Sequence, residues 1–200
     1  MRGGELAPTG SALSGLSFLE RLLGVELEWN PLTRASRAAR AERAGRLGEA
    51  LRLYFEAGHE ERLLTCIRRT VPDVPHRAVL LEAAGELVAL RTAMVSAAQR
   101  RVVVAKTIAD EVADSALALW DSADRLTSVS AQVLATPRLK HAVEHEVRAL
   151  ANLVAELREA RSLVTEAMLT DQAGADRLTT ARDRLRAQTE AVREVTRELS

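Results

Sequence analysis

Apolar residues recur at helical spacing along most of the chain, and this pattern is the main structural signal in the sequence. Residues 1–12 carry small and polar side chains with three glycines and predict a loose tail. Residues 14–27 place their apolar side chains on one face and predict a short amphipathic helix. Asn30, a suitable N-cap, and Pro31 then begin a second helix that extends to about residue 44.

The longest apolar repeat lies between His76 and Leu134, a stretch that contains no proline and one glycine. Its apolar residues fit a heptad repeat, with Arg91 as the one clear exception. A single helix of about 60 residues would measure roughly 90 Å. Several apolar residues lie outside the heptad columns and need to be covered by the N-terminal part of the chain or by self-association: Leu87, Leu90, Met94, Val104 and Ile108.

Thr136 and Pro137 interrupt this repeat with an N-cap followed by a proline at the first helical position. The helix that follows keeps an apolar stripe to Leu199, with a weak joint at residues 170–174. The two segments have similar lengths, so the sequence predicts an antiparallel hairpin that turns near residues 135–137. In this arrangement we expect Lys106 to lie beside residues of about 159–166.

The segment from Val71 to Pro75 contains two prolines and predicts the end of a helix over residues 59–70 and a domain boundary. The predicted fold class is therefore all-α. Residues 1–12 form a flexible tail and residues 13–71 a small helical unit. Residues 76–200 form an elongated antiparallel coiled-coil hairpin or bundle.

A glycine turn and the helix after it, within residues 31–58, have small and large side chains at a distinctive spacing. Small Ala38 lies in the helix before the turn. The residues that carry the pattern are Gly45, Leu47, Ala50, Tyr54 and Ala57. This segment resembles a tetratricopeptide repeat, with Gly45 at the inter-helix turn. The resemblance implies one helical hairpin of that style.

The segment also departs from the tetratricopeptide pattern. Arg34, Arg37 and Ala41 stand where that family usually has larger apolar or aromatic residues, and no proline closes the unit. The resemblance covers a single unit, whereas repeat proteins stack about three. It therefore predicts a lone hairpin.

Composition narrows the class of protein. Apolar residues make up 47% of the chain, and 28 basic residues balance 28 acidic ones, so we expect a folded protein without bulk electrostatic attraction to nucleic acid. The single Cys66 forms no internal disulfide. Apolar stretches are interrupted by charges and the N-terminus lacks a signal-peptide core, so we expect a cytoplasmic protein.

One motif suggests catalysis. His141, Glu144 and His145 form an H-x-x-E-H string, the pattern of inverted-motif zinc peptidases. Both histidines lie roughly opposite the apolar stripe of their helix, which favours solvent-exposed side chains. We therefore expect no catalytic site, no metal and no cofactor. Cys66 has no histidine within a turn and fits a buried or half-buried thiol.

An acidic stretch lies in the second half of the apolar repeat between His76 and Leu134. Without glycine turns, and spread over four helical turns, it is typical of a solvated helix face rather than of a cation site. Its members are Asp110, Glu111, Asp114, Asp121 and Asp124.

A ladder of arginines is the strongest candidate for contact with a partner. The arginines recur at every third position, and only Glu42 opposes them between Pro31 and Arg46. They suit an acidic or anionic partner, although an arginine-rich soluble helix face would look the same. Tyr54 and Trp120 are candidate aromatic contacts, Trp120 either in the core or at an interface. The ladder consists of Arg34, Arg37, Arg40, Arg43 and Arg46.

Two functions fit these features. The first is a non-catalytic helical scaffold or interaction subunit that binds a protein partner or another copy of itself. The second is a peripheral membrane protein, in which the helix over residues 16–27 inserts its apolar face and the arginine ladder meets anionic lipid. Glu20, Glu26 and Glu28 would meet the same lipid charge, so the scaffold is preferred.

Overall fold

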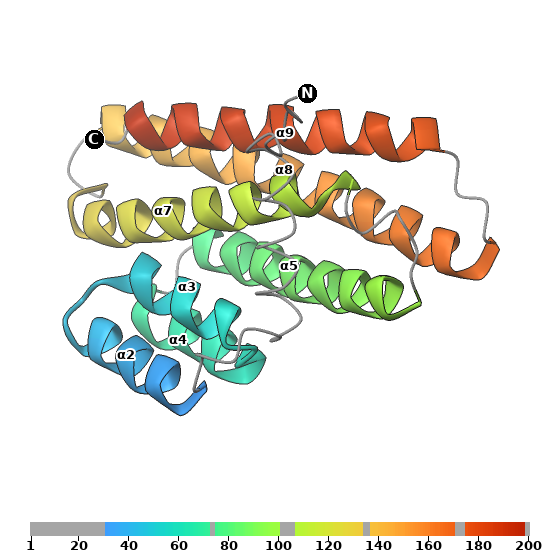
Figure 1. Cartoon of the computed structure of the whole chain (residues 1–200). Helices are drawn as coiled ribbons and strands as arrows, with labels where there is room; N and C mark the ends of the chain where they lie inside the picture. Colours follow the sequence, from blue (N-terminus) through green and yellow to red (C-terminus); the bar gives the residue numbers. More distant parts are fainter. Residues whose placement is uncertain (1–30, 73–74, 101–106, 134–136, 171–174, 199–200) are drawn as a thin grey trace, which may run out of the picture.

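The computed structural model describes residues 31–72, 75–100, 107–133, 137–170 and 175–198. Every regular element in these ranges is an α-helix, and the helices pack as a bundle (Figure 1), which confirms the all-α class. The predicted tail and the predicted helix over residues 14–27 lie outside the described residues. The helices are α2 (Pro31–Arg43), α3 (Leu47–Glu56), α4 (Glu60–Thr70), α5 (Pro75–Gln99), α7 (Ala109–Val133), α8 (Pro137–Thr170) and α9 (Ala175–Glu198).

Four of these helices, α5, α7, α8 and α9, form an antiparallel up-and-down bundle (Figure 1). α5 and α8 lie side by side and run in the same direction, and α9 packs against both α7 and α8. Arg158 and Arg161 of α8 contact the Glu86 carboxylate of α5 at 2.9 and 3.3 Å. These ion pairs place the middle of α8 beside the first half of α5.

The prediction of one helix over residues 76–134 is wrong. α5 ends at Gln99 and α7 begins at Ala109, and the two helices run antiparallel beside each other. A rod of two long helices would leave the surplus apolar residues in water, whereas folding the arm back buries them. Lys106 and Val104 lie outside the described residues. Leu87, Leu90, Met94 and Ile108 all have 0% exposure.

The smaller helices α2, α3 and α4 pack on one side of the bundle, against α5 and α7 (Figure 1). Gly45 and Gly58 end α2 and α3 with φ angles of 72° and 73°, a conformation that favours glycine. In both places the residue after the glycine donates its N–H to a carbonyl five residues earlier, as in a Schellman motif. The predicted turn at Gly45 is therefore confirmed.

One hydrophobic core joins the small helices to the bundle. It extends from α2 through α3 and α4 to residues of α9, and Phe55 of α3 packs on Trp120 of α7 with ring centroids 5.7 Å apart. α4 ends at Thr70 and is followed by the buried Val71, so the predicted boundary falls where the chain passes from α4 to α5. Independent folding of residues 31–71 stays a prediction.

α3 touches α7 closely at Gly48. A Cβ atom added there would lie 2.8 Å from the Trp120 carbonyl oxygen and 2.8 Å from an Asp124 carboxylate oxygen. Real Cβ atoms essentially never approach other heavy atoms this closely. The absence of a side chain at Gly48 therefore sets the distance between α3 and α7.

We expect Gly48→Ala to destabilise the protein by about 1–3 kcal/mol, because the backbone of α7 has to move to admit the methyl group. Gly85→Ala in α5 is the matched control, since a Cβ atom added at Gly85 would have no neighbouring atom within 4 Å outside its own stretch of helix. That change should stabilise the fold by about 0.5–1 kcal/mol through helix propensity. Chemical denaturation of both variants measures the difference, and equal effects would contradict the close contact.

Candidate interaction groove

Three of the predicted partner-binding residues lie in the interior. Tyr54 and Trp120 are 4% and 2% exposed, and Tyr54 donates its hydroxyl hydrogen bond to Glu42. Arg34 is buried on α2, and its guanidinium donates to the Glu56 carbonyl at 3.4 Å. The surface role predicted for Arg34 and Tyr54 is therefore corrected to one within the core of the chain, and Trp120 takes the core position that was one of its two predicted places.

The other members of the arginine ladder are exposed. Arg37, Arg40 and Arg43 lie on the solvent side of α2, and Arg43 donates to the carbonyl of Ala39 in its own helix. Arg46 lies in the turn before α3 and forms an ion pair with Glu49 at 2.6 Å. The ladder thus does not act as a single surface, and its last member belongs to a groove.

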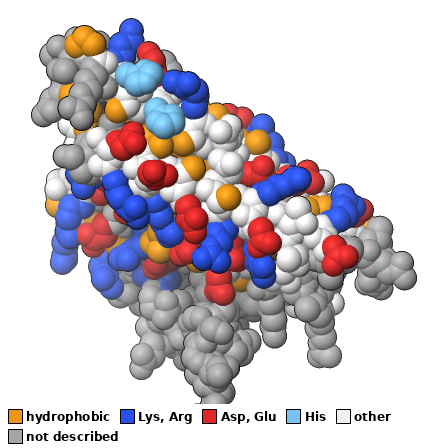
Figure 2. Space-filling model, turned by 90° about the horizontal axis from the view of Figure 1, so that it is seen from above, with side chains coloured by type: hydrophobic (Ala, Val, Ile, Leu, Met, Phe, Trp, Pro, Cys, Tyr) orange, Lys and Arg blue, Asp and Glu red, His pale blue; other side chains and the backbone are white. Residues whose placement is uncertain are grey.

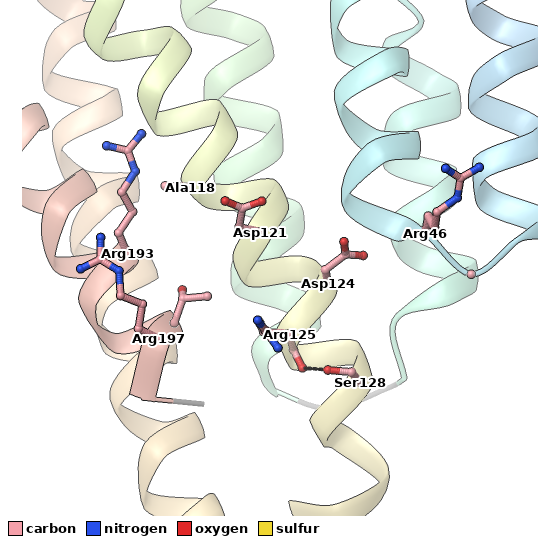
Figure 3. Close-up of a pocket in the computed structure, with 10 residues that line it drawn as sticks. Arg46, Ala118, Asp121, Asp124, Arg125, Ser128, Arg193 and Arg197 are labelled. Atoms are coloured by element: carbon pink, nitrogen blue, oxygen red, sulfur yellow. Dashed lines mark hydrogen bonds between the residues drawn. The ribbon is translucent and has the colours of Figure 1, made fainter. Parts of the chain in front are cut away.

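This groove, of about 720 Å³, runs between the turn before α3, the outer side of α7 and the last turns of α9. Figure 3 shows Arg46 on one side, the α7 side chains in the middle, and Arg193 and Arg197 projecting from α9 on the other. The charged residues that line the groove are Arg46, Asp121, Asp124, Arg125, Arg193 and Arg197.

Several of these charges are already matched. Asp124 accepts a hydrogen bond from the Gly48 N–H at 2.7 Å, and Arg193 contacts Asp114 at 3.4 Å. Desolvation raises the pKa of Asp124, while the hydrogen bond from Gly48 acts in the opposite direction. Asp124 therefore serves as the cap of α3, and its predicted place on a solvated face is wrong.

Two arginines of the groove remain available to a ligand. Arg125 and Arg197 are exposed, and neither forms a salt bridge with a residue that the structure describes. Arg125 lies on α7 and Arg197 on α9, so they come from separate helices that flank the groove (Figure 3). Guanidinium groups bind carboxylates and phosphates through two parallel hydrogen bonds. The groove is therefore suited to a negatively charged group.

The wall formed by α9 has a polar layer behind it. Thr196 lines the groove and lies 2.6 Å from the carboxyl of Glu146 on α8, which has 0% exposure. Desolvation raises the pKa of Glu146, and the nearby hydroxyls of Ser122 and Thr196 act in the opposite direction. A second buried contact, between Ser115 and Thr189 at 2.7 Å, joins α7 to α9.

The residues that suggested other chemistry lie apart from the groove. His141 and His145 are exposed, and no group of three potential metal ligands forms among the described residues. Figure 2, which looks down on the side of α8 and α9, shows histidines among mixed basic and acidic side chains. Cys66 is buried, as predicted, and burial raises the pKa of its thiol to about 12. Within the described ranges, no helix is both long and apolar enough to cross a bilayer.

Comparison of the chain with models of protein families, with curated proteins and with solved structures found no match. The tetratricopeptide resemblance of residues 31–58 thus stays a prediction, although α2 and α3 do form a helical hairpin.

Sequence reasoning missed Arg125, Arg193 and Arg197, because α7 and α9 are far apart in the chain. The one local signal is the four-residue spacing of Arg193 and Arg197, which places them on the same helix face.

We expect Asp124→Ala to destabilise the protein by about 1–2 kcal/mol, because the buried Gly48 N–H loses its acceptor. Asp124→Asn keeps an oxygen that can accept the hydrogen bond from Gly48, so it should lower the free energy of unfolding much less. Asp121→Ala, an exposed neighbour on the same helix, should change stability by no more than about 0.5 kcal/mol. Thermal unfolding distinguishes the three, and an Asp124→Ala variant as stable as Asp121→Ala would contradict the cap.

Proposed function

We propose that this protein is a non-catalytic helical interaction subunit of a protein assembly, and that its groove binds an acidic segment of a partner protein. The observation that carries the proposal is the pair Arg125 and Arg197, which line the groove from different helices and form no salt bridge with a described residue, although the charge of Arg125 also acts on its neighbour Asp124. Arginine is also enriched among the residues that dominate binding at protein interfaces.

The mixed character of the groove supports a protein partner. Four arginines and two aspartates line it, and Asp124 is engaged by the backbone of α3. Asp121 is exposed and places one negative charge on α7, one helical turn before Arg125 (Figure 3). An acidic segment with one basic or neutral position opposite Asp121 would match this pattern, and unmatched charges would oppose other sequences.

We expect the double variant Arg125→Glu and Arg197→Glu to weaken binding of a fluorescein-labelled, Glu- and Asp-rich peptide about tenfold, since two exposed ion pairs are replaced by repulsion. The charge-matched control is Arg148→Glu with Arg184→Glu, on exposed parts of α8 and α9 outside the groove. Fluorescence anisotropy at two salt concentrations measures both variants.

Equal weakening by the groove variant and the control would mean that only net charge matters, and would contradict the groove as the site. A dimer of the wild type in sedimentation experiments, lost in the groove variant, would replace the separate partner with a second copy of this chain.

The alternative function is peripheral membrane binding, and one observation favours it: Arg37 and Arg40 are exposed on α2 and form no salt bridge with described residues. The two functions differ in their response to lipid.

We expect the full-length protein not to float with anionic phosphatidylserine vesicles at physiological salt, because its acidic and basic residues balance. A contrary result would be that the wild type and the groove variant both float, whereas the double variant Arg37→Glu and Arg40→Glu does not. That result would replace the proposed function with membrane binding.

A further inference from the structure

Glu146 is the most deeply buried carboxyl group among the described residues. It belongs to α8 and has no exposed surface, and its Oε1 lies 2.6 Å from the Thr196 hydroxyl on α9. Its second oxygen, Oε2, is buried and accepts no hydrogen bond of good geometry from the described residues, although the nearby Ser122 hydroxyl of α7 acts to lower the pKa of Glu146. Among the described residues no guanidinium or ammonium group forms an ion pair with it, in contrast to buried Arg91, which contacts Glu60. Desolvation is therefore the largest influence on this carboxyl group and disfavours its negative charge, while the hydroxyls of Ser122 and Thr196 oppose that effect.

The hydrogen-bond donors available to Glu146 lead to the same conclusion. Thr196 Oγ1 lies within hydrogen-bond distance of both Glu146 Oε1 and the Val192 carbonyl oxygen, at 2.6 and 2.8 Å. A hydroxyl has one proton and cannot donate fully to two acceptors. When Glu146 is protonated, its O–H donates to Thr196 and Thr196 donates to Val192, so both contacts are complete hydrogen bonds. When Glu146 is ionised, its Oε1 and the Val192 carbonyl oxygen compete for the single proton of Thr196, and the Ser122 hydroxyl of α7 is the other neutral donor near the carboxylate.

We infer that protonated Glu146 holds the last turn of α9 against the bundle, and that ionisation of Glu146 loosens this turn. Local opening of the turn would give the carboxylate access to water, which burial denies it. Thr196 lies in the middle of the turn, so its contact with Glu146 is lost when the turn opens.

The pKa of Glu146 supports the direction of this effect. Desolvation raises it above the ordinary value of 4.5, so the closed turn binds the proton more tightly than the open turn does. Closing is therefore most favourable below pH 4.5. It becomes less favourable as pH rises toward the raised pKa of the closed state, and stays constant above that pKa.

Other charged groups lie around the contact on α8 and α9 and on the neighbouring helix α7. The charges of His145 on α8 and Glu198 on α9 act on the pKa of Glu146 in opposite directions. Asp121 and Arg125 of α7 line the groove outside Thr196. Arg193 and Arg197, which line the same groove, lie three residues before and one after Thr196.

The same turn carries one wall of the groove, which links Glu146 to the proposed function. Loosening it displaces the guanidinium groups of Arg193 and Arg197, so peptide binding should weaken as Glu146 ionises. This second consequence depends on the proposed function, whereas the opening of the turn does not.

Amide hydrogen exchange of the full-length protein, measured between pH 5 and pH 8, tests the inference. The protection factors of residues 192–198 should fall about tenfold per pH unit until the pKa of the closed state is passed. The protection of residues 180–188, in the other half of α9, should change little. A flat profile for residues 192–198 in the wild type would overturn the inference, whatever the variants do.

Variants identify the titrating group. Glu146→Gln cannot ionise and should keep residues 192–198 protected across the range, whereas His145→Gln should keep the slope of the wild type. Thr189→Val removes the buried contact with Ser115 and should lower protection equally at every pH. If the protection of residues 192–198 still falls with pH in Glu146→Gln but no longer does so in His145→Gln, the titrating group is the histidine and the proposal is overturned.

Peptide binding separates this inference from the proposed function. If the acidic peptide binds, its affinity should fall over the same pH range in the wild type and stay constant in Glu146→Gln. If the peptide does not bind at any pH, the groove proposal fails, while the exchange profiles still decide the role of Glu146.

Discussion

The position of the ten-residue helix α3 is the constraint on which the rest of the structure depends. A helix this short leaves unpaired N–H groups at its start and unpaired carbonyls at its end, and it has a partial charge at each end. Its own N-cap residue, Arg46, provides no side-chain acceptor. Asp124 of α7 supplies the acceptor instead, for the N–H of Gly48. At the other end of α3, Arg91 of α5 donates to the Phe55 carbonyl. Arg34 of α2 donates to the Glu56 carbonyl. Each end of α3 thus meets a side chain of the opposite charge from another helix. This fixes α2 and α4 on the bundle and places the turn with Arg46 beside α7.

The charge of Arg91 also explains why the apolar pattern of α5 is interrupted. Its guanidinium lies 4.8 Å from the centre of the Phe55 ring and contacts Glu60 at 3.2 Å, in addition to the Phe55 carbonyl. A buried cation is tolerated when its donors are satisfied and a carboxylate lies nearby. In a two-helix rod the same residue would only have disturbed the seam. In the actual fold it connects three helices, and the exception to the heptad pattern was the sequence signal for that contact.

Local chemistry in the sequence predicted the helix ends well. The prolines at positions 31, 75 and 137 begin α2, α5 and α8, Gly45 ends the first hairpin helix, and the weak joint at residues 170–174 separates α8 from α9.

The path of the chain between Gln99 and Ala109 could not be predicted in this way, because no proline or glycine lies there and the heptad columns suit a straight arm and a folded one equally. Only the surplus apolar residues indicated that more surface had to be covered. The groove was beyond sequence reasoning for a related reason: Asp124 and Arg125 are adjacent in an acidic stretch, and their different roles depend on where α3 and α9 pack.

Two of the buried charged side chains, Arg91 and Glu146, support opposite walls of the groove, and their contacts differ in kind. The wall formed by α7 and the turn before α3 is held by Asp124 and, through α3, by Arg91, which contacts both Glu60 and the Phe55 carbonyl. The α9 wall is held near the groove by Val192, Val195 and Thr196, and Thr196 shares one proton between two acceptors. A ligand that bridges Arg125 and Arg197 would join the two walls, and would favour the closed turn and, through Thr196, the protonated form of Glu146. Binding and proton uptake are then linked in both directions, since each stabilises the arrangement that the other requires.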